Sequence, residues 1–69
     1  MKAGDLVKLA KWCKNGPALM HVTDATNRYY VKALFLEGQR TGSIATVSRG
    51  NIFTLEGYDA AMEKHYASR

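Results

Sequence analysis

The chain has 69 residues, 46% of them apolar, with ten Lys or Arg, six Asp or Glu and one cysteine. A protein of this size buries only about 60% of the surface of its unfolded chain, which leaves one thin core and no deep, water-excluded active site. These numbers exclude a two-domain enzyme, and the apolar and aromatic content excludes a disordered chain. We therefore expect residues 1–69 to form a single domain.

The net charge of +4 lies entirely in the first half of the chain. Residues 1–32 hold six basic and two acidic side chains, whereas residues 33–69 hold four of each. An excess of cations in one segment attracts anionic partners, nucleic acid among them. It is also an ordinary means of keeping a small protein in solution.

The single cysteine and the hydropathy of the chain indicate the cellular compartment of the protein. Cys13 has no disulfide partner within the chain, which favours a reducing compartment. No apolar stretch approaches the roughly 20 residues needed to span a bilayer, and lysines interrupt the N-terminus too often for a signal peptide. We therefore expect a soluble, cytoplasmic protein that does not bind membranes.

Turn signals rich in Gly, Asn and Asp recur about every ten residues, a spacing typical of short antiparallel strands. The segments between them are rich in Val, Ile, Tyr, Phe and Thr, which favour strands. We place five strands at about 5–12, 18–24, 28–36, 43–48 and 51–55.

The segment 28–36 gives the clearest prediction for the core. Its alternate residues form one apolar face: Tyr29, Val31, Ala33 and Phe35. Leu34 and Leu36 make its second half apolar on both sides, as in a bent strand that passes beneath another part of a small closed barrel. We expect the other strands to add further core residues: Met20, Val22, Ile44 or Val47, Phe53 and Leu55.

The C-terminal segment has the periodicity of a helix. Four positions fall close together on a wheel of about 3.6 residues per turn: Tyr58, Met62, His65 and Tyr66. We expect a short helix at about 58–67, or at about 59–67 with Asp59 as its N-cap. Because so short a helix is marginal alone, it docks either on the barrel, which we favour, or on a partner.

The order of the motifs resembles that of small Src-homology-three-like barrels, including KOW-type modules and compact bacterial and phage-encoded barrels. The opening Gly4-Asp5-Leu6-Val7-Lys8-Leu9 is followed by Gly16-Pro17 and the apolar Met20-His21-Val22. Tyr30 to Phe35, Gly38 and Phe53-Thr54-Leu55 fit the same plan, over about residues 3–56. The resemblance implies a mainly β fold, a five-stranded antiparallel barrel at about 4–56 followed by the helix. The segment Ala10 to Asn15 departs from KOW modules, which carry glycines there.

The strongest candidate for a binding surface interleaves cations with aromatic rings, because single-stranded nucleic acid is held by phosphate contacts and by stacking of its bases. If the first and third strands share a surface, Trp12 and Tyr30 are its stacking platforms. The alternative is a solvated lysine face with Trp12 covering one end of the barrel. The candidate residues for nucleic-acid or partner binding are Lys8, Lys11, Trp12, Lys14, Arg28, Tyr30, Lys32 and Arg49.

The predicted turns carry further polar residues that either extend this surface or shape hairpin tips: Arg40, Thr41, Arg49 and Asn51. Arg49-Gly50-Asn51 has the composition of a tight hairpin turn.

The sequence does not favour catalysis or a bound metal or cofactor. Cys13, His21 and His65 lack the close spacing of zinc ligands, and Cys13 has no neighbouring base to activate it. The acidic residues are scattered, and no glycine-rich phosphate loop is present.

Two functions therefore remain. The first is a non-catalytic module that binds DNA or RNA through the basic and aromatic residues. The second is a protein-binding inhibitor or adaptor, including a phage-encoded protein that acts on a host protein. Either is compatible with a monomer or a homodimer.

Overall fold

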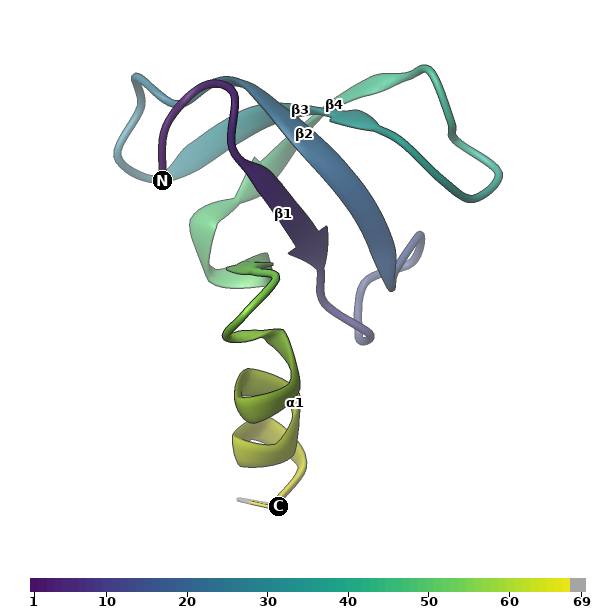
Figure 1. The fold of residues 1–69 in the computed structure, drawn as a ribbon, viewed down its shortest axis with the longest axis vertical. Helices are drawn as coiled ribbons and strands as arrows, with labels where there is room; N and C mark the ends of the chain where they lie inside the picture. Colours follow the sequence, from purple (N-terminus) through teal and green to yellow (C-terminus); the bar gives the residue numbers. More distant parts are fainter. Residues whose placement is uncertain (68–69) are drawn as a thin grey trace.

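In a computed structural model of the protein, which describes residues 1–67, five strands and a C-terminal helix form a mainly β fold (Figure 1). The elements are β1 (Leu6–Leu9), β2 (Ala18–Asp24), β3 (Tyr30–Phe35), β4 (Ile44–Ser48), the 3-10 turn η1 (Arg49–Asn51), β5 (Ile52–Thr54) and α1 (Tyr58–Ala67). The strands form one sheet in the order β4-β3-β2-β1-β5, and every pair is antiparallel. The predicted class, antiparallel β with a C-terminal helix, is confirmed.

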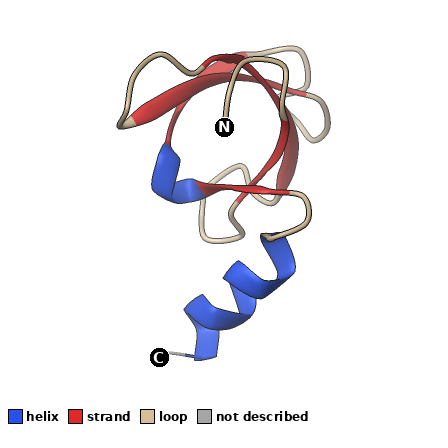
Figure 2. Cartoon of the chain, turned by 60° about the vertical axis from the view of Figure 1, so that its left-hand side comes forward, coloured by secondary structure: helices blue, strands red, loops and turns tan. Residues whose placement is uncertain are grey.

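The sheet curls around its core without closing (Figure 2). The edge strands β4 and β5 do not pair, so hydrogen bonds do not complete a barrel. The 3-10 turn η1 carries the chain from one edge to the other, which corrects the predicted hairpin at Arg49-Gly50-Asn51. The predicted closed barrel is therefore an open, barrel-like sheet.

Strand β1 ends three residues earlier than predicted. Beyond Leu9, the Cys13 amide donates to the Ala10 carbonyl (3.2 Å) and the Gly16 amide to the Cys13 carbonyl (3.0 Å). These two turns place Lys11 and Trp12 in a loop rather than on a strand. The other four strands lie within two residues of their predicted bounds, and β2 matches them.

The turn at Gly4-Asp5 has a backbone geometry that glycine permits. Gly4 has a φ of +96°, a conformation that L side chains rarely adopt. The Asp5 carboxylate accepts a hydrogen bond from the Lys2 amide at 2.9 Å. This turn leads the chain into β1.

One face of the curved sheet forms the main core. Its buried residues alternate along the strands: Val7, Leu9, Ala18, Met20, Val22, Val31, Ala33, Phe35, Val47 and Ile52. Met20 and Val22 on β2 and Val31 on the neighbouring β3 are fully buried. This regular alternation is what a sheet with one dry face requires.

Three apolar residues that we expected in the core are exposed: Tyr29, Leu36 and Leu55. Of the alternatives Ile44 and Val47, the structure buries Val47. Tyr29 lies in the turn before β3, so the strand alternation does not reach it. Ile44 and Val47 are three residues apart in β4, so their side chains point to opposite faces of the sheet. Val47 takes the core face, which leaves Ile44 on the outer face. In β5 the buried residue is Ile52, which puts Phe53 on the outside and leaves Leu55 beyond the strand.

Helix α1 packs on its own barrel, as the sequence favoured. Tyr58 and Met62 are buried with Ala10 in a second cluster, against which Phe53 and Cys13 also pack. Asp59 lies in the first turn and is not the N-cap. Within residues 1–67 no helix has the length and apolar character needed to cross a membrane.

We predict that Met62→Ala costs about 2 kcal/mol of unfolding free energy, the low end for a buried methionine, because the second cluster has only three buried residues among those described. Urea unfolding followed by the fluorescence of Trp12 measures this. Glu63→Ala, at an exposed position of the same helix, is the control and stays within about 0.5 kcal/mol of the parent. Equal stabilities of the two variants would contradict the docking of α1.

Candidate nucleic-acid interface

Six of the eight predicted binding residues lie in two groups toward opposite ends of the sheet, while Lys8 lies on β1 and Arg49 on η1. In an antiparallel meander, successive connections alternate between the ends, so loops 10–17 and 36–43 share one end and turn 25–29 lies at the other (Figure 1). Lys11, Trp12 and Lys14 belong to the first group. The second group holds Arg28, with Tyr30 and Lys32 following on β3.

Strands β1 and β3 do not present one continuous basic face. Strand β2 lies between them, and the register aligns Leu6 with His21, His21 with Leu34, and Leu34 with Ile44. These four residues form a row across the outer face of the sheet, which we call the apolar row because three of its members are aliphatic. Leu6 and Ile44 in it are 47% and 60% exposed. The row separates Lys8 from Lys32.

Trp12 joins the loop to the helix. Its indole N–H donates to Asn51 Oδ1 at 3.0 Å, and its ring lies edge-on to Phe53 with centroids 5.9 Å apart. The His65 ring stacks on the indole, with centroids 4.1 Å apart. At most one face of Trp12 is thus left for a base, and much of the ring serves to hold α1.

Lys8 is also engaged within the fold. Its ammonium lies 4.7 Å from the centroid of the Tyr58 ring, a cation–π contact. Burial raises the pKa of the Tyr58 hydroxyl, so the ring is neutral at physiological pH. Lys8 therefore contacts the first residue of α1.

Arg49 joins η1 to the β2–β3 turn by hydrogen bonds, and we call these contacts the Arg49 clamp. From η1 its guanidinium donates to the Ala25 carbonyl at 2.7 Å and to the Asn27 carbonyl at 2.8 and 3.0 Å. The Arg49 amide also donates to the Tyr29 carbonyl at 3.0 Å. Because the guanidinium is part-buried and its N–H groups bind backbone carbonyls, its main contacts stabilise the β2–β3 turn.

The turn held by Arg49 is further ordered by its own side chains. Asp24 accepts hydrogen bonds from the amide and the hydroxyl of Thr26, at 2.9 and 2.8 Å. These bonds, with a smaller contribution from Lys32, hold the pKa of the Asp24 carboxyl below its usual range. The Asn27 side chain accepts from the Tyr29 amide at 2.7 Å.

The end of this turn and the start of β3 carry four exposed residues that we call the tyrosine surface: Arg28, Tyr29, Tyr30 and Lys32. The Arg28 guanidinium lies over the Tyr29 ring, 4.8 Å from its centroid, and donates to the Tyr29 hydroxyl at 2.6 Å. Tyr29 is 66% exposed, the largest value among the exposed large hydrophobic residues within 1–67. The sequence prediction missed Tyr29 as a surface residue, although Asn27, a turn former two residues earlier, indicated that the strand begins later.

The remaining candidates are the thiol of Cys13 and groups of metal-ligating side chains. Burial raises the pKa of the Cys13 thiol, which disfavours the nucleophilic thiolate. Within residues 1–67, no three His, Cys, Asp or Glu side chains gather in a group that can hold a metal ion.

No protein-family model, curated protein or solved structure matches this chain.

We predict that Arg49→Lys lowers the free energy of unfolding by about 1–3 kcal/mol, although it conserves the charge. A lysine ammonium cannot reproduce the forked contacts of the guanidinium, and unpaired carbonyls are costly. Thermal unfolding at matched pH measures the loss. Arg40→Lys is the control, because the Arg40 side chain forms no hydrogen bond or ion pair within residues 1–67. Unchanged stability of Arg49→Lys would refute the clamp.

Proposed function

We propose that the protein is a non-catalytic binding module that contacts single-stranded nucleic acid through the tyrosine surface. The observation that carries this proposal is the Tyr29 ring, which is 66% exposed and backed by Arg28. With a guanidinium on one face, the opposite face can accept a base. Stacking on an aromatic ring is the main sequence-tolerant contact of proteins that bind single strands.

The charges of the same surface support a nucleic-acid ligand. Arg28 contacts Tyr29, and Lys32 lies on the same face of β3 as Tyr30, two residues along the strand. Two cations beside two rings can pair phosphates while bases stack. The clamp of Arg49 holds the turn in place before a ligand arrives, which lowers the entropy that binding costs.

The order of the elements supports the finer resemblance to Src-homology-three-like barrels. A strand led by Gly4-Asp5, a loop, a second strand and a hairpin follow one another as in that plan. We place the protein in the cytoplasm, where the unpaired Cys13 stays reduced.

We predict that Tyr29→Ala weakens binding of a fluorescein-labelled oligonucleotide by about tenfold, because base–ring stacking contributes about 1–3 kcal/mol per base. Fluorescence anisotropy with single-stranded DNA and RNA, each at two salt concentrations, measures the affinity. Tyr29→Phe, which retains the ring, is the matched control and binds within about twofold of the parent.

The salt dependence provides an independent check. Lys32→Gln removes one phosphate contact and lowers the slope of log K against log salt by about 0.7, the value per contact for single strands. A protein that binds neither DNA nor RNA at low salt, or a Tyr29→Ala variant with the parent's affinity, would refute the proposal.

A second function, as a protein-binding inhibitor or adaptor, is favoured by a different observation. The apolar row of Leu6, His21, Leu34 and Ile44 crosses four strands on the outer face of the sheet. Exposed apolar patches of this kind mark protein contacts in soluble domains. Affinity purification with the parent and with a Leu6→Asp, Ile44→Asp double variant tests it, because a stoichiometric partner of the row is lost only with the double variant.

A further inference from the structure

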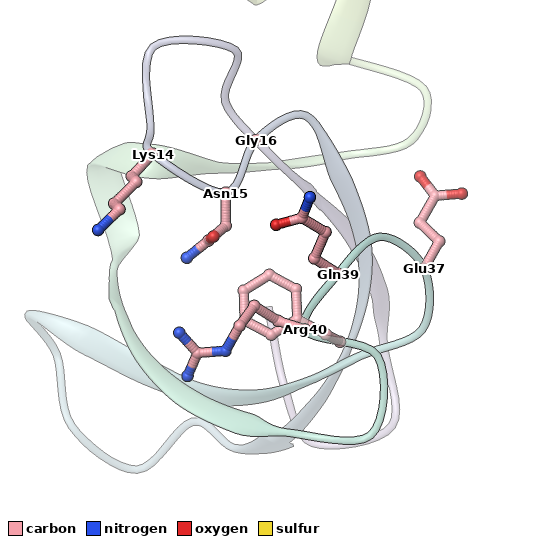
Figure 3. A pocket seen from close by; sticks show the side chains of 7 residues that line it. Lys14, Asn15, Gly16, Glu37, Gln39 and Arg40 are labelled. Carbon is pink, nitrogen blue, oxygen red and sulfur yellow. The ribbon is translucent and has the colours of Figure 1, made fainter.

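A polar pocket lies at the other end of the sheet, away from the tyrosine surface (Figure 3). It has a volume of about 230 Å³ and lies between loop 10–17 and loop 36–43. Its lining residues are Lys14, Asn15, Gly16, Phe35, Glu37, Gln39 and Arg40. The two loops are far apart in the sequence, so the pocket exists only in the folded protein.

The pocket is rich in unused hydrogen-bond donors. Within residues 1–67, neither the Lys14 ammonium nor the Arg40 guanidinium forms a hydrogen bond or an ion pair. The side-chain amides of Asn15 and Gln39 also form no hydrogen bond within residues 1–67. Figure 3 shows these amides on the same two loops as Lys14 and Arg40. A guanidinium, an ammonium and two amide groups together present many N–H donors to one space.

The one acidic residue of the lining is directed elsewhere. Glu37 Oε1 accepts a hydrogen bond from the Leu19 amide at 3.0 Å, which ties the carboxylate to the start of β2. Figure 3 shows the Glu37 carboxylate pointing away from Lys14, Asn15 and Arg40. The positive charge of the pocket is therefore only partly compensated.

The loop that supplies Lys14 and Asn15 is held in place by the fold. At Gly16 an added Cβ would lie 1.9 Å from the Ala10 carbonyl oxygen, so no larger residue fits the observed backbone. Two consecutive turns from Ala10 to Gly16 are each closed by a backbone hydrogen bond. The cation and the amide are thus presented on an ordered segment, as pre-organised binding requires.

We infer that this pocket binds a phosphate group. A phosphate monoester carries about −1.5 to −2 charges at neutral pH and three strong acceptor oxygens, which match two cations and a set of donors. Arginine pairs with such oxygens through two parallel N–H donors, and lysine adds a point charge. The volume is below the roughly 300 Å³ of the smallest drug-sized sites, which suits one phosphate with part of its ester group. This site is distinct from the tyrosine surface.

The test uses the intact ¹⁵N-labelled protein and inorganic phosphate as the probe. Titration at pH 7.5 is followed by amide NMR shifts, and sodium chloride of equal ionic strength is the reference. We expect saturable shifts at Asn15, Gly16, Gln39 and Arg40. Shifts that chloride reproduces, or that never saturate, overturn the proposal.

Variants locate the ligand. Lys14→Gln and Arg40→Gln each weaken phosphate binding about tenfold, the loss expected for one charge-assisted hydrogen bond. Lys11→Gln is the matched control, because Lys11 is exposed in the same loop and does not line the pocket. Glu37→Gln retains an acceptor for Leu19 and strengthens binding about twofold, a gain that misfolding cannot produce. Parent-like affinity in both Lys14→Gln and Arg40→Gln overturns the site.

The source of the phosphate is decided by three further ligands: adenosine monophosphate and one oligonucleotide with and without a 5′-phosphate. Shifts at the pocket with only the phosphorylated strand identify a strand end, and shifts with both strands identify an internal phosphodiester. Shifts with adenosine monophosphate alone identify a free ester. Tyr29→Ala leaves inorganic phosphate binding unchanged, so failure of this site and failure of the tyrosine surface are separate results.

Discussion

The Arg49 guanidinium binds the carbonyls of Ala25 and Asn27 and thereby ties η1 to the β2–β3 turn. The sheet is open between β4 and β5, and η1 has to carry the chain across that gap. By binding the β2–β3 turn from η1, Arg49 secures the crossing. The same three hydrogen bonds set the turn from which Arg28 and Tyr29 extend, so the geometry of the tyrosine surface depends on this clamp.

Basic residues serve two separate purposes in this small protein. Lys8 and Arg49 contact a tyrosine ring and backbone carbonyls, and these contacts support the helix and the turn. Lys14 and Arg40 make no such contacts within residues 1–67 and flank the polar pocket. A domain with one thin core uses long cationic side chains as part of its packing, because their aliphatic stems and planar groups cover surface that few apolar residues remain to cover.

Much of the fold follows from local pattern. Alternation predicted Met20, Val22, Val31 and Phe35 as core, since one face of the sheet is dry and the strand period is two. The errors arise where the alternation was extended past a strand end, as at Tyr29, Leu36 and Leu55. In β4 both faces carry apolar residues, so the sequence left Ile44 and Val47 as alternatives, and the structure selects Val47. The outer apolar row was not predicted, because its members lie on four strands and only the register aligns them.

The sequence by itself determined the approximate positions of the five strands and the helix, because these depend on backbone preferences and periodicity within a few residues. It also located the excess of positive charge in residues 1–32. Only the tertiary structure decided which cations are free. Arg49 binds a carbonyl 24 residues away, and Trp12 stacks on His65 of the C-terminal helix. Contacts between distant residues are set by strand order and register, and no local pattern encodes which partner a side chain meets.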